Sequence, residues 1–242
     1  MIQRKYLHYL ASRISGPGQR PRCATVFGAP FYCDDPLGVA SLQRVYCDSH
    51  HLKDYLPNRP VVVDVGANIG QFAFFARQYL EAARVISVEP LPESHQMLLR
   101  NTPVPGDSLC CAVTDREGSV TIHVAQETTQ LSSYVQQPDC VYRACHTVAA
   151  RTLDGIAAEL GVGEVDLLKI DTEGSEFDVL RSAPELLRRS KFVLVEMSVF
   201  RNCSGDLFQV GAFLKERGFE LVALSPCRQR RPRDLDGLFR RL

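Results

Sequence analysis

The stretch Val61-Val62-Val63-Asp64-Val65-Gly66-Ala67-Asn68-Ile69-Gly70 decides the fold of this chain. Its apolar first half predicts a strand that is buried on both faces of a parallel sheet, and its glycines predict a tight turn. Residues 71–83 then have the pattern of a helix. Because backbone N–H groups and the positive end of a helix point out of such a turn, we expect a ligand there.

The next predicted strand ends in a carboxylate. The apolar run 84–88 is followed by Glu89 and Pro90, and an acidic residue at the tip of the second strand can accept hydrogen bonds from both hydroxyls of a ribose. The turn differs from the dinucleotide pattern G-x-G-x-x-G, because Asn68 stands where that pattern has the glycine that admits a pyrophosphate. These residues therefore predict a nucleoside ligand without a pyrophosphate.

Three further motifs follow in the second half of the chain. They are Thr152-Leu153-Asp154, then Leu168-Lys169-Ile170-Asp171-Thr172-Glu173-Gly174-Ser175-Glu176, then Val195-Glu196-Met197. With D-V-G-A-N-I-G and E-P they make five motifs in order, and this order resembles the FkbM-type family of class I S-adenosylmethionine-dependent methyltransferases. The departures are Thr172, where the family usually has valine, and the first sixty residues, which match no family motif.

The resemblance implies an O-methyltransferase that acts on a hydroxyl group of a sugar, glycan or secondary metabolite. Its cofactor is then S-adenosylmethionine, with the adenosine between the turn and Glu89 and the adenine near the end of the third strand. The expected cofactor contacts are Asp64, Gly66, Ala67, Asn68, Ile69, Gly70, Glu89, Pro90, Cys111, Ala112 and Asp171.

The order of elements predicts a Rossmann-like α/β fold, because strands and helices alternate from Val61 onward, as in a doubly wound and mostly parallel sheet. Strands are expected at 61–65, 85–88, 109–113, 165–170, 192–196 and 219–224. Helices are expected at 71–83, 92–101, 153–160, 173–187 and 206–217. Residues 119–124 alternate with period two and should form an antiparallel ribbon with 144–149. The resemblance also implies an antiparallel last strand at 235–242.

Residues 1–58 form a lead-in to the methyltransferase domain, which is expected to span 59–242. The lead-in should contain a basic amphipathic helix at 1–15, a turn between apolar pairs at 26–32 and a helix at 42–56. The first helix either packs on the domain or lies on a membrane surface, and the residues alone leave both open.

The amino-acid composition favours some classes of binding partner and some cellular compartments over others. The 28 basic residues equal the 28 acidic ones, which argues against nucleic acid or a membrane as the main partner. No apolar run is long enough to span a bilayer. Nine cysteines without zinc-type spacing indicate free thiols in a cytoplasmic protein. Composition leaves the oligomeric state open.

The chemistry is expected where the first and fourth strands of the domain meet, because ligands of open α/β sheets bind beyond the strand carboxyl ends at the topological switch. Asp171, Glu173 and Glu196 follow or end strands at that edge, and each is a candidate general base for a hydroxyl nucleophile. A divalent ion beside Asp171 would be another way to activate the hydroxyl, but no ligand spacing points to a metal site. Asp64 and Lys169, on adjacent strands, can pair with each other while Asp64 also holds the cofactor amino group through water.

Several interpretations remain open at this point. Glu173 is either a base or only a stabiliser of the first helical turn, and Ser132 and Ser133 either touch the acceptor or form an ordinary polar loop. Residues 228–233 contain four arginines, and this loop over the site either attracts an anionic acceptor or is merely solvated. For the whole chain the alternatives are an NAD-type oxidoreductase, which Asn68 argues against, and an inactive methyltransferase-like binding protein. Methylation of a protein is also open.

Overall fold

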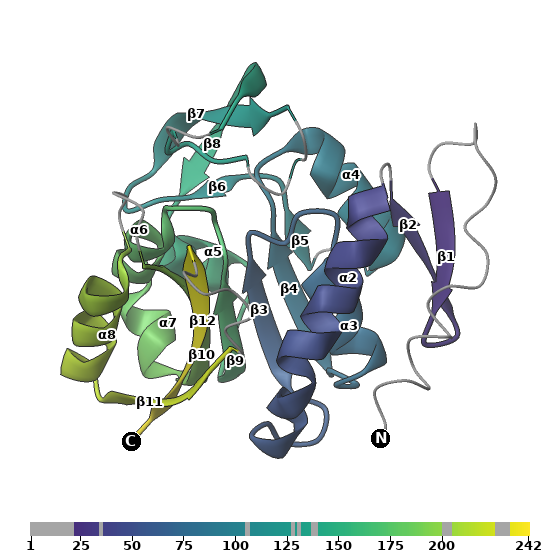
Figure 1. Ribbon diagram of the computed structural model, residues 1–242. Helices are drawn as coiled ribbons and strands as arrows, with labels where there is room; N and C mark the ends of the chain where they lie inside the picture. Colours follow the sequence, from purple (N-terminus) through teal and green to yellow (C-terminus); the bar gives the residue numbers. More distant parts are fainter. Residues whose placement is uncertain are drawn as a thin grey trace.

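A seven-stranded sheet forms the centre of the computed structural model, which describes residues 22–33, 36–104, 107–126, 129, 132–136, 140–199, 205–225 and 233–242 (Figure 1). Within these residues the strand order is β11-β12-β10-β9-β3-β4-β5. The strands are β3 (Val61–Val65), β4 (Arg84–Val88), β5 (Ser108–Leu109), β9 (Val165–Ile170), β10 (Ser190–Ser198), β11 (Phe219–Leu224) and β12 (Asp234–Arg241). Only β12 pairs antiparallel with its neighbours β10 and β11, which confirms the predicted doubly wound sheet and its antiparallel last strand.

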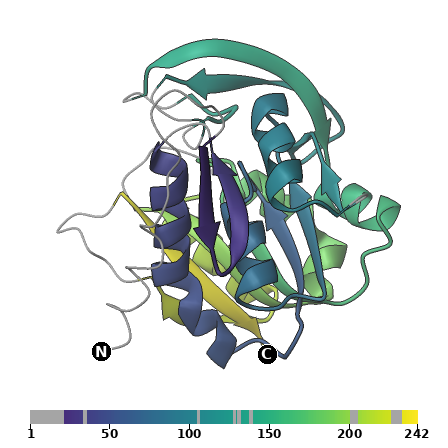
Figure 2. The same cartoon turned by 90° about the vertical axis from the view of Figure 1, so that its right-hand side faces the viewer.

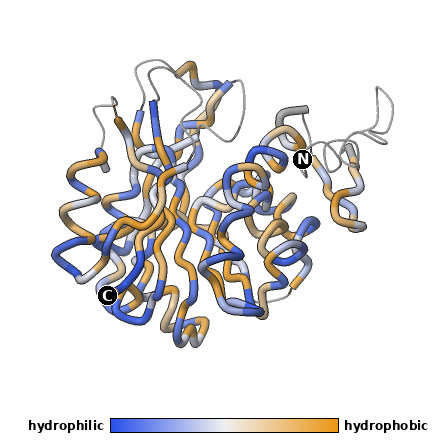
Figure 3. Tube along the Cα trace, turned by 60° about the horizontal axis from the view of Figure 1, so that its bottom comes forward, coloured by the Kyte–Doolittle hydropathy of each residue, from blue (hydrophilic) through white to orange (hydrophobic). Residues whose placement is uncertain are grey.

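The central strand β3 is buried on both faces of the sheet. Val63 and Val65 point into one apolar cluster, and Val62 points into the other. A run of valines without polar alternation is what a doubly covered parallel strand requires. Figure 3 shows the same feature along the chain, with apolar residues concentrated on the central strands.

Helices cover the two faces of this sheet. One face carries α2 (Pro36–Ser49), α3 (Gln71–Gln78) and α4 (Pro92–Asn101), and the other carries α5 (Leu153–Glu159), α6 (Glu176–Arg181), α7 (Pro184–Arg188) and α8 (Leu207–Glu216). Phe74 and Phe75 of α3 are 1% and 0% exposed, because α2 of the lead-in packs on the side of α3 that the sheet leaves open. Among the described residues no helix is long and apolar enough to cross a membrane.

The lead-in contains the predicted hairpin, β1 (Arg22–Val26) and β2 (Ala29–Cys33). Its two-residue turn, Phe27 and Gly28, has φ angles of 50° and 79°, the left-handed backbone that tight hairpins favour. The helix predicted at 42–56 is α2 followed by a 3₁₀ turn, η1 (His50–Asp54). Phe31 packs edge-on against Phe74 of α3 at 5.2 Å between ring centroids. The predicted helix at 1–15 lies outside the described residues.

A second, three-stranded sheet has the order β6-β8-β7. Its strands are β6 (Ala112–Val113), β7 (Gly118–Ala125) and β8 (Tyr142–Arg151). The register from Ser119 opposite Ala149 to Val124 opposite Ala144 is the predicted ribbon. Figure 2 shows this ribbon arching over the end of the main sheet.

One predicted strand is wrong, since residues 109–113 divide between the two sheets. Leu109 pairs with Val88 at the end of β4, and Ala112 pairs with Ala150 of β8. The main-sheet ladder does not continue past Glu89, because the next N–H on that side belongs to Leu91 and donates to Glu89 Oε1 instead. The chain therefore crosses to the ribbon between these two pairings.

Two predicted helices have different bounds in the structure. The helix expected at 173–187 is interrupted, because Glu173 and Gly174 have positive φ angles of 57° and 110° and lie before α6. Pro184 then starts the separate helix α7, and the residue before a proline avoids the helical region. The helix expected at 71–83 ends with α3 at Gln78, and Glu81 beyond it has a φ of 55°.

Candidate functional site

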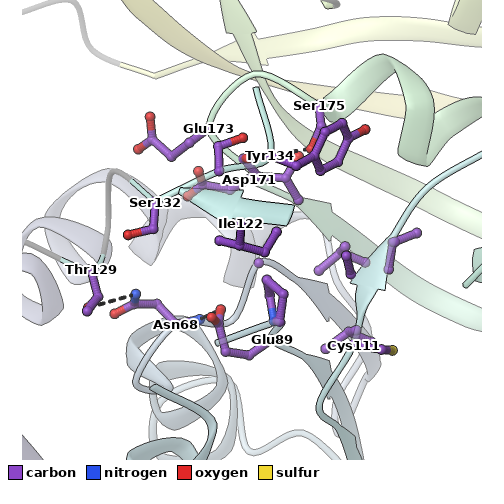
Figure 4. Close-up of a pocket in the computed structure, with 18 residues that line it drawn as sticks. Asn68, Glu89, Cys111, Ile122, Thr129, Ser132, Tyr134, Asp171, Glu173 and Ser175 are labelled. Carbon is purple, nitrogen blue, oxygen red and sulfur yellow. Dashed lines mark hydrogen bonds between the residues drawn. The ribbon is translucent and has the colours of Figure 1, made fainter. Parts of the chain in front are cut away.

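A pocket opens where β3, β4 and β9 end beneath the ribbon. Its volume is about 520 Å³ with the open mouth included. Figure 4 shows Asn68 and Glu89 at one side of it and Asp171 and Glu173 at the other. The lining residues are Val65, Gly66, Asn68, Val88, Glu89, Pro90, Cys111, Ala112, Val113, Ile122, Thr129, Ser132, Ser133, Tyr134, Asp171, Thr172, Glu173 and Ser175.

The turn after β3 depends on two glycines. Gly66 has a φ of 79°, and a Cβ there would lie 1.8 Å from the carbonyl oxygen of Asp171. Only a residue without a side chain therefore lets the ends of β3 and β9 approach this closely. Gly70, with a φ of 91°, begins α3 and leaves 2.9 Å between a Cβ and Leu98 Cδ1.

Asn68 connects this turn to two other segments. Its backbone N–H donates to Glu89 Oε2 at 2.8 Å, and its side-chain amide donates to Thr129 Oγ1 at 3.3 Å. Its φ of 49° lies in the left-handed region, which asparagine tolerates better than most residues. Asn68 therefore adopts a backbone conformation that would be strained for a bulkier residue.

Glu89 is 4% exposed and its carboxylate holds two backbone groups. Oε2 accepts from Asn68 N, and Oε1 accepts from Leu91 N at 2.9 Å. Burial raises the pKa of Glu89 to about 7, although these hydrogen bonds act against the rise. Through these two hydrogen bonds Glu89 also shapes the turn. Each oxygen retains a lone pair for a further donor.

Lys169 pairs with Asp64, as the sequence suggested. The two residues are opposite each other on β9 and β3, and Lys169 Nζ lies 3.1 Å from Asp64 Oδ1 and 3.4 Å from Asp171 Oδ2. Burial alone would lower the pKa of Lys169, but Asp171 and Asp64 outweigh it and raise that pKa. The ammonium group therefore stays charged and holds Asp171 at the edge of the pocket.

The three candidate bases lie together. Oxygens of Asp171, Glu173 and Glu196 are all within 4.8 Å of one another. Burial, and then the charges of Asp171 and Glu173, raises the pKa of Glu196 well above its usual value. Arg233, just before β12, contacts the cluster, with its Nη2 3.5 Å from Glu173 Oε2. The cations of Lys169 and Arg233 thus offset part of the negative charge of the cluster.

Glu176 takes the role that the sequence suggested for Glu173. Its carboxylate, on a residue 2% exposed, accepts from Thr172 N at 2.8 Å and from Gly174 N at 3.0 Å at the start of α6. Glu173 lies before the helix and lines the pocket. The glycine at position 174 was the available signal that the helix begins later than predicted.

Of the remaining predicted site residues, some line the pocket and others do not. Cys111 and Ala112 line the pocket beside Pro90, whereas Cys110 is exposed. Ala67 and Ile69 belong to the turn, and both are buried. Tyr134 and Thr129, which also line the pocket, were missed because no motif marks them. Of the arginine-rich loop predicted at 228–233, residues 228–232 lie outside the described residues, and Arg233 contacts Glu173 at the pocket.

Comparison with known proteins gives a consistent result. Residues 64–221 match the family described as Methyltransferase FkbM domain, and the cofactor of this family is S-adenosylmethionine. The 2-O-methyltransferase NoeI of Sinorhizobium fredii is 27% identical over 183 residues, covering 69% of this chain and 75% of that protein. The 31-O-demethyl-FK506 methyltransferase FkbM of Streptomyces tacrolimicus is 29% identical over 217 residues, covering 75% of this chain and 81% of that protein.

Solved structures share the fold. A methyltransferase FkbM from Methylobacillus flagellatus superposes with a TM-score of 0.51 at 17% identity, covering 76% of this chain but only 44% of that one. Magnesium protoporphyrin IX methyltransferase (ChlM) from Synechocystis PCC 6803 has a TM-score of 0.50 at 12% identity, covering 99% of this chain and 96% of that one. Both support the class I methyltransferase fold, and the match over residues 64–221 shows that this chain belongs to the FkbM methyltransferase family.

Proposed function

We propose that this protein transfers the methyl group of S-adenosylmethionine to a hydroxyl group of a small molecule or glycan. The observation that carries the proposal is the placement of Asp171 and Glu173 on one side of the pocket and Glu89 on the other (Figure 4). A nucleoside held at Glu89 would direct its remaining atoms toward the carboxylates. The names of the two relatives, a 2-O-methyltransferase and a 31-O-demethyl-FK506 methyltransferase, support an oxygen acceptor.

The pocket residues fit an adenosine group. Glu89 offers one free lone pair on each oxygen to the two ribose hydroxyls. Buried apolar side chains beside it form a slot of the kind that takes a flat base: Val88, Cys111, Ala112, Val113 and Ile122. The proposed cofactor contacts are therefore this slot, Glu89, Pro90 and the turn 64–70, together with Asp171.

Asp171 is the base that we propose for the acceptor hydroxyl. When bound, S-adenosylmethionine supplies an electrophilic methyl carbon, and the acceptor oxygen must lose a proton as it attacks. Asp171 is the most accessible of the three carboxylates at 40% side-chain exposure, against 14% for Glu173 beside Arg233. Glu196 has a raised pKa and would carry a proton, so it would donate a hydrogen bond. Alignment of the reacting atoms would supply much of the remaining rate.

The charge around the site favours a neutral acceptor. Carboxylates of Asp171, Glu173 and Asp234 outnumber the described cations that contact them, Lys169 and Arg233. An anionic acceptor, the other expectation, would have to bind through the arginines at 228–232. A neutral sugar or metabolite hydroxyl needs no such charge partner.

The test compares Asp171→Asn with the wild type in transfer of an isotope-labelled methyl group to a panel of sugars, other alcohols and amines. We expect label on a hydroxyl group only, and a rate for Asp171→Asn lower by about 10²–10⁴. The melting temperature should change little, because Lys169 keeps Asp64 as its partner. A full rate in Asp171→Asn would exclude this base, and label on amines alone would exclude O-methylation.

A further inference from the structure

The segment 132–136 is hydrogen-bonded to the ribbon and lines the pocket where we place the cofactor. His123 N donates to Ser133 O at 2.8 Å, which joins the segment to β7. The Ser132 hydroxyl accepts from Ala125 N at 3.0 Å, also on β7. Ser132, Ser133 and Tyr134 all line the pocket (Figure 4). The ribbon therefore places this segment as one wall of the pocket.

Tyr134 joins that wall to the main body of the protein. Its ring packs against a buried cluster that includes Leu91, Ala112 and Ile122, so the ring lies on the side where we place the adenine. Its hydroxyl donates to Asp178 Oδ2 at 2.7 Å, and Asp178 belongs to α6, which directly follows the loop of Asp171 and Glu173. Burial, and then this hydrogen bond, raises the pKa of Tyr134, so the hydroxyl remains a donor.

Asp178 also forms an ion pair with Arg181, through its other carboxylate oxygen. Arg181 Nη2 lies 2.7 Å from Asp178 Oδ1 and 2.9 Å from Asp115 Oδ2. The two oxygens of Asp178 therefore have separate partners, Tyr134 on one and Arg181 on the other. This separation allows the hydrogen bond and the ion pair to be removed one at a time.

We propose that Tyr134 is a positioning residue whose hydrogen bond to Asp178 latches the wall 132–136 over the cofactor and sets how long the cofactor stays bound. The inference rests on the proposed function in one respect, namely that this pocket holds S-adenosylmethionine. With the bond made, the wall keeps its place against the bound cofactor. Loss of the bond lets the wall shift and weakens its contacts with the cofactor, so dissociation becomes faster, while association, whose rate is set mainly by encounter, changes little.

The experiment measures association and dissociation rates of S-adenosylhomocysteine by stopped-flow fluorescence or surface plasmon resonance. Tyr134→Phe and Asp178→Ala both remove the latch bond, and we expect dissociation to be roughly tenfold faster or more in each, the effect of losing a hydrogen bond to a charged group. Asp178→Asn keeps a side-chain oxygen for the tyrosine hydroxyl and should dissociate almost as slowly as the wild type. Association should stay within about twofold in all three.

Two matched controls separate the latch from general weakening. Arg181→Gln removes the ion pair but leaves the Tyr134 bond, and Tyr55→Phe removes a tyrosine hydroxyl away from the pocket. Both should keep the wild-type dissociation rate. Melting temperatures without ligand identify any variant that is merely destabilised, and if Asp178→Ala does not fold, Tyr134→Phe and Asp178→Asn decide the matter.

Unchanged dissociation in Tyr134→Phe overturns the latch while leaving the proposed function intact. Equally fast dissociation in Asp178→Asn and Asp178→Ala also overturns it, because the charge and not the hydrogen bond would then matter. If the wild type itself fails to bind S-adenosylhomocysteine, the proposed function falls and the latch falls with it.

Discussion

At the scale of the residue, Glu89 combines burial with charge. The side chain is almost fully enclosed, and its pKa is raised to about 7, so the ionised form is unfavourable until further donors arrive. Two ribose hydroxyls would be such donors. The buried charge of Glu89 destabilises the protein when the pocket is empty, and it gains hydrogen bonds when a ligand binds. Glu89 therefore strengthens ligand binding at the expense of protein stability.

Replacement of Glu89 by alanine should weaken the binding of S-adenosylhomocysteine by about 1–3 kcal/mol, because a charged acceptor for two hydroxyls is lost. Isothermal titration calorimetry measures the change directly. An affinity equal to that of the wild type would show that the adenosine does not bind at Glu89. The glycine turn would then have to bind the cofactor without a ribose partner.

The pH dependence of stability gives a second prediction for Glu89. Its pKa is about 7 in the folded protein and close to 4.5 in the unfolded chain, so between these values the folded state holds more protons. The free energy of unfolding must therefore fall as pH rises through this window, by on the order of 3 kcal/mol from this residue.

Glu89→Gln cannot titrate and serves as the comparison. Melting temperatures of wild type and variant, taken without ligand from pH 5 to pH 8, should differ progressively, with the wild type losing more stability at the high end. Parallel curves would show that Glu89 does not titrate in this range. Binding of S-adenosylhomocysteine by the wild type should weaken below about pH 7 as the carboxyl is protonated.

At the scale of the element, the turn between β3 and α3 depends on a close approach of two strands. Gly66 has a left-handed φ, and any Cβ would collide with the backbone of Asp171. This contact joins segments that are 105 residues apart in the sequence (171 − 66). The conformation of the turn and the packing of β3 against β9 at the switch point therefore depend on each other.

Gly66→Ala should therefore destabilise the protein by at least about 3 kcal/mol, from backbone strain and overlap together. Gly163→Ala is the matched control, because a Cβ there meets nothing within 4 Å and its φ is ordinary. Chemical denaturation of both variants gives the difference. If the two are equally stable, the approach of β3 and β9 is less constrained than the geometry indicates.

At the scale of the whole molecule, the lead-in is bound to the turn through one buried side chain. The Asn101 amide donates to Ile69 O at 2.7 Å and to Tyr32 O at 2.9 Å, and its oxygen accepts from Tyr32 N at 2.7 Å. Asn101 thus joins β2, the end of α4 and the cofactor turn. Residues before position 58 in this way contribute to the shape of a pocket that they do not line.

Asn101→Ala should lower stability by about 2–4 kcal/mol, since three hydrogen bonds are lost and buried backbone groups are left unpaired. It should also weaken S-adenosylhomocysteine binding, because the turn loses a support. Thr102→Val, which removes a neighbouring side-chain hydrogen bond within α4, is the control and should leave binding unchanged. Thermal melts with and without ligand compare the two, and an Asn101→Ala variant with full affinity would show that the lead-in does not influence the pocket.

The resemblance to FkbM-type methyltransferases implied the antiparallel last strand. From its own patterns the sequence determined the doubly wound sheet, the ribbon pairing and the meeting of Asp64 with Lys169. These follow from patterns in which each residue reports its own environment: valine runs for buried strands, period-two alternation for the ribbon, glycines for the turn. The grouping of Asp171, Glu173 and Glu196 follows as well, because the carboxyl ends of parallel strands share one edge.

Only the tertiary structure decided the division of residues 109–113 between two sheets, the role of Glu176 and the contact of Tyr134 with Asp178. Each depends on partners that local sequence does not specify. Leu109 stays in the main sheet because β4 is there to pair with it, and Ala112 leaves because β8 is. Tyr134 and Asp178 are 44 residues apart, and neither lies in a motif. A hydrogen bond between two such residues exists only once the fold has brought the ribbon and α6 together, which is why this contact could not be found from the sequence, although Ser132 and Ser133 of the same wall were candidates.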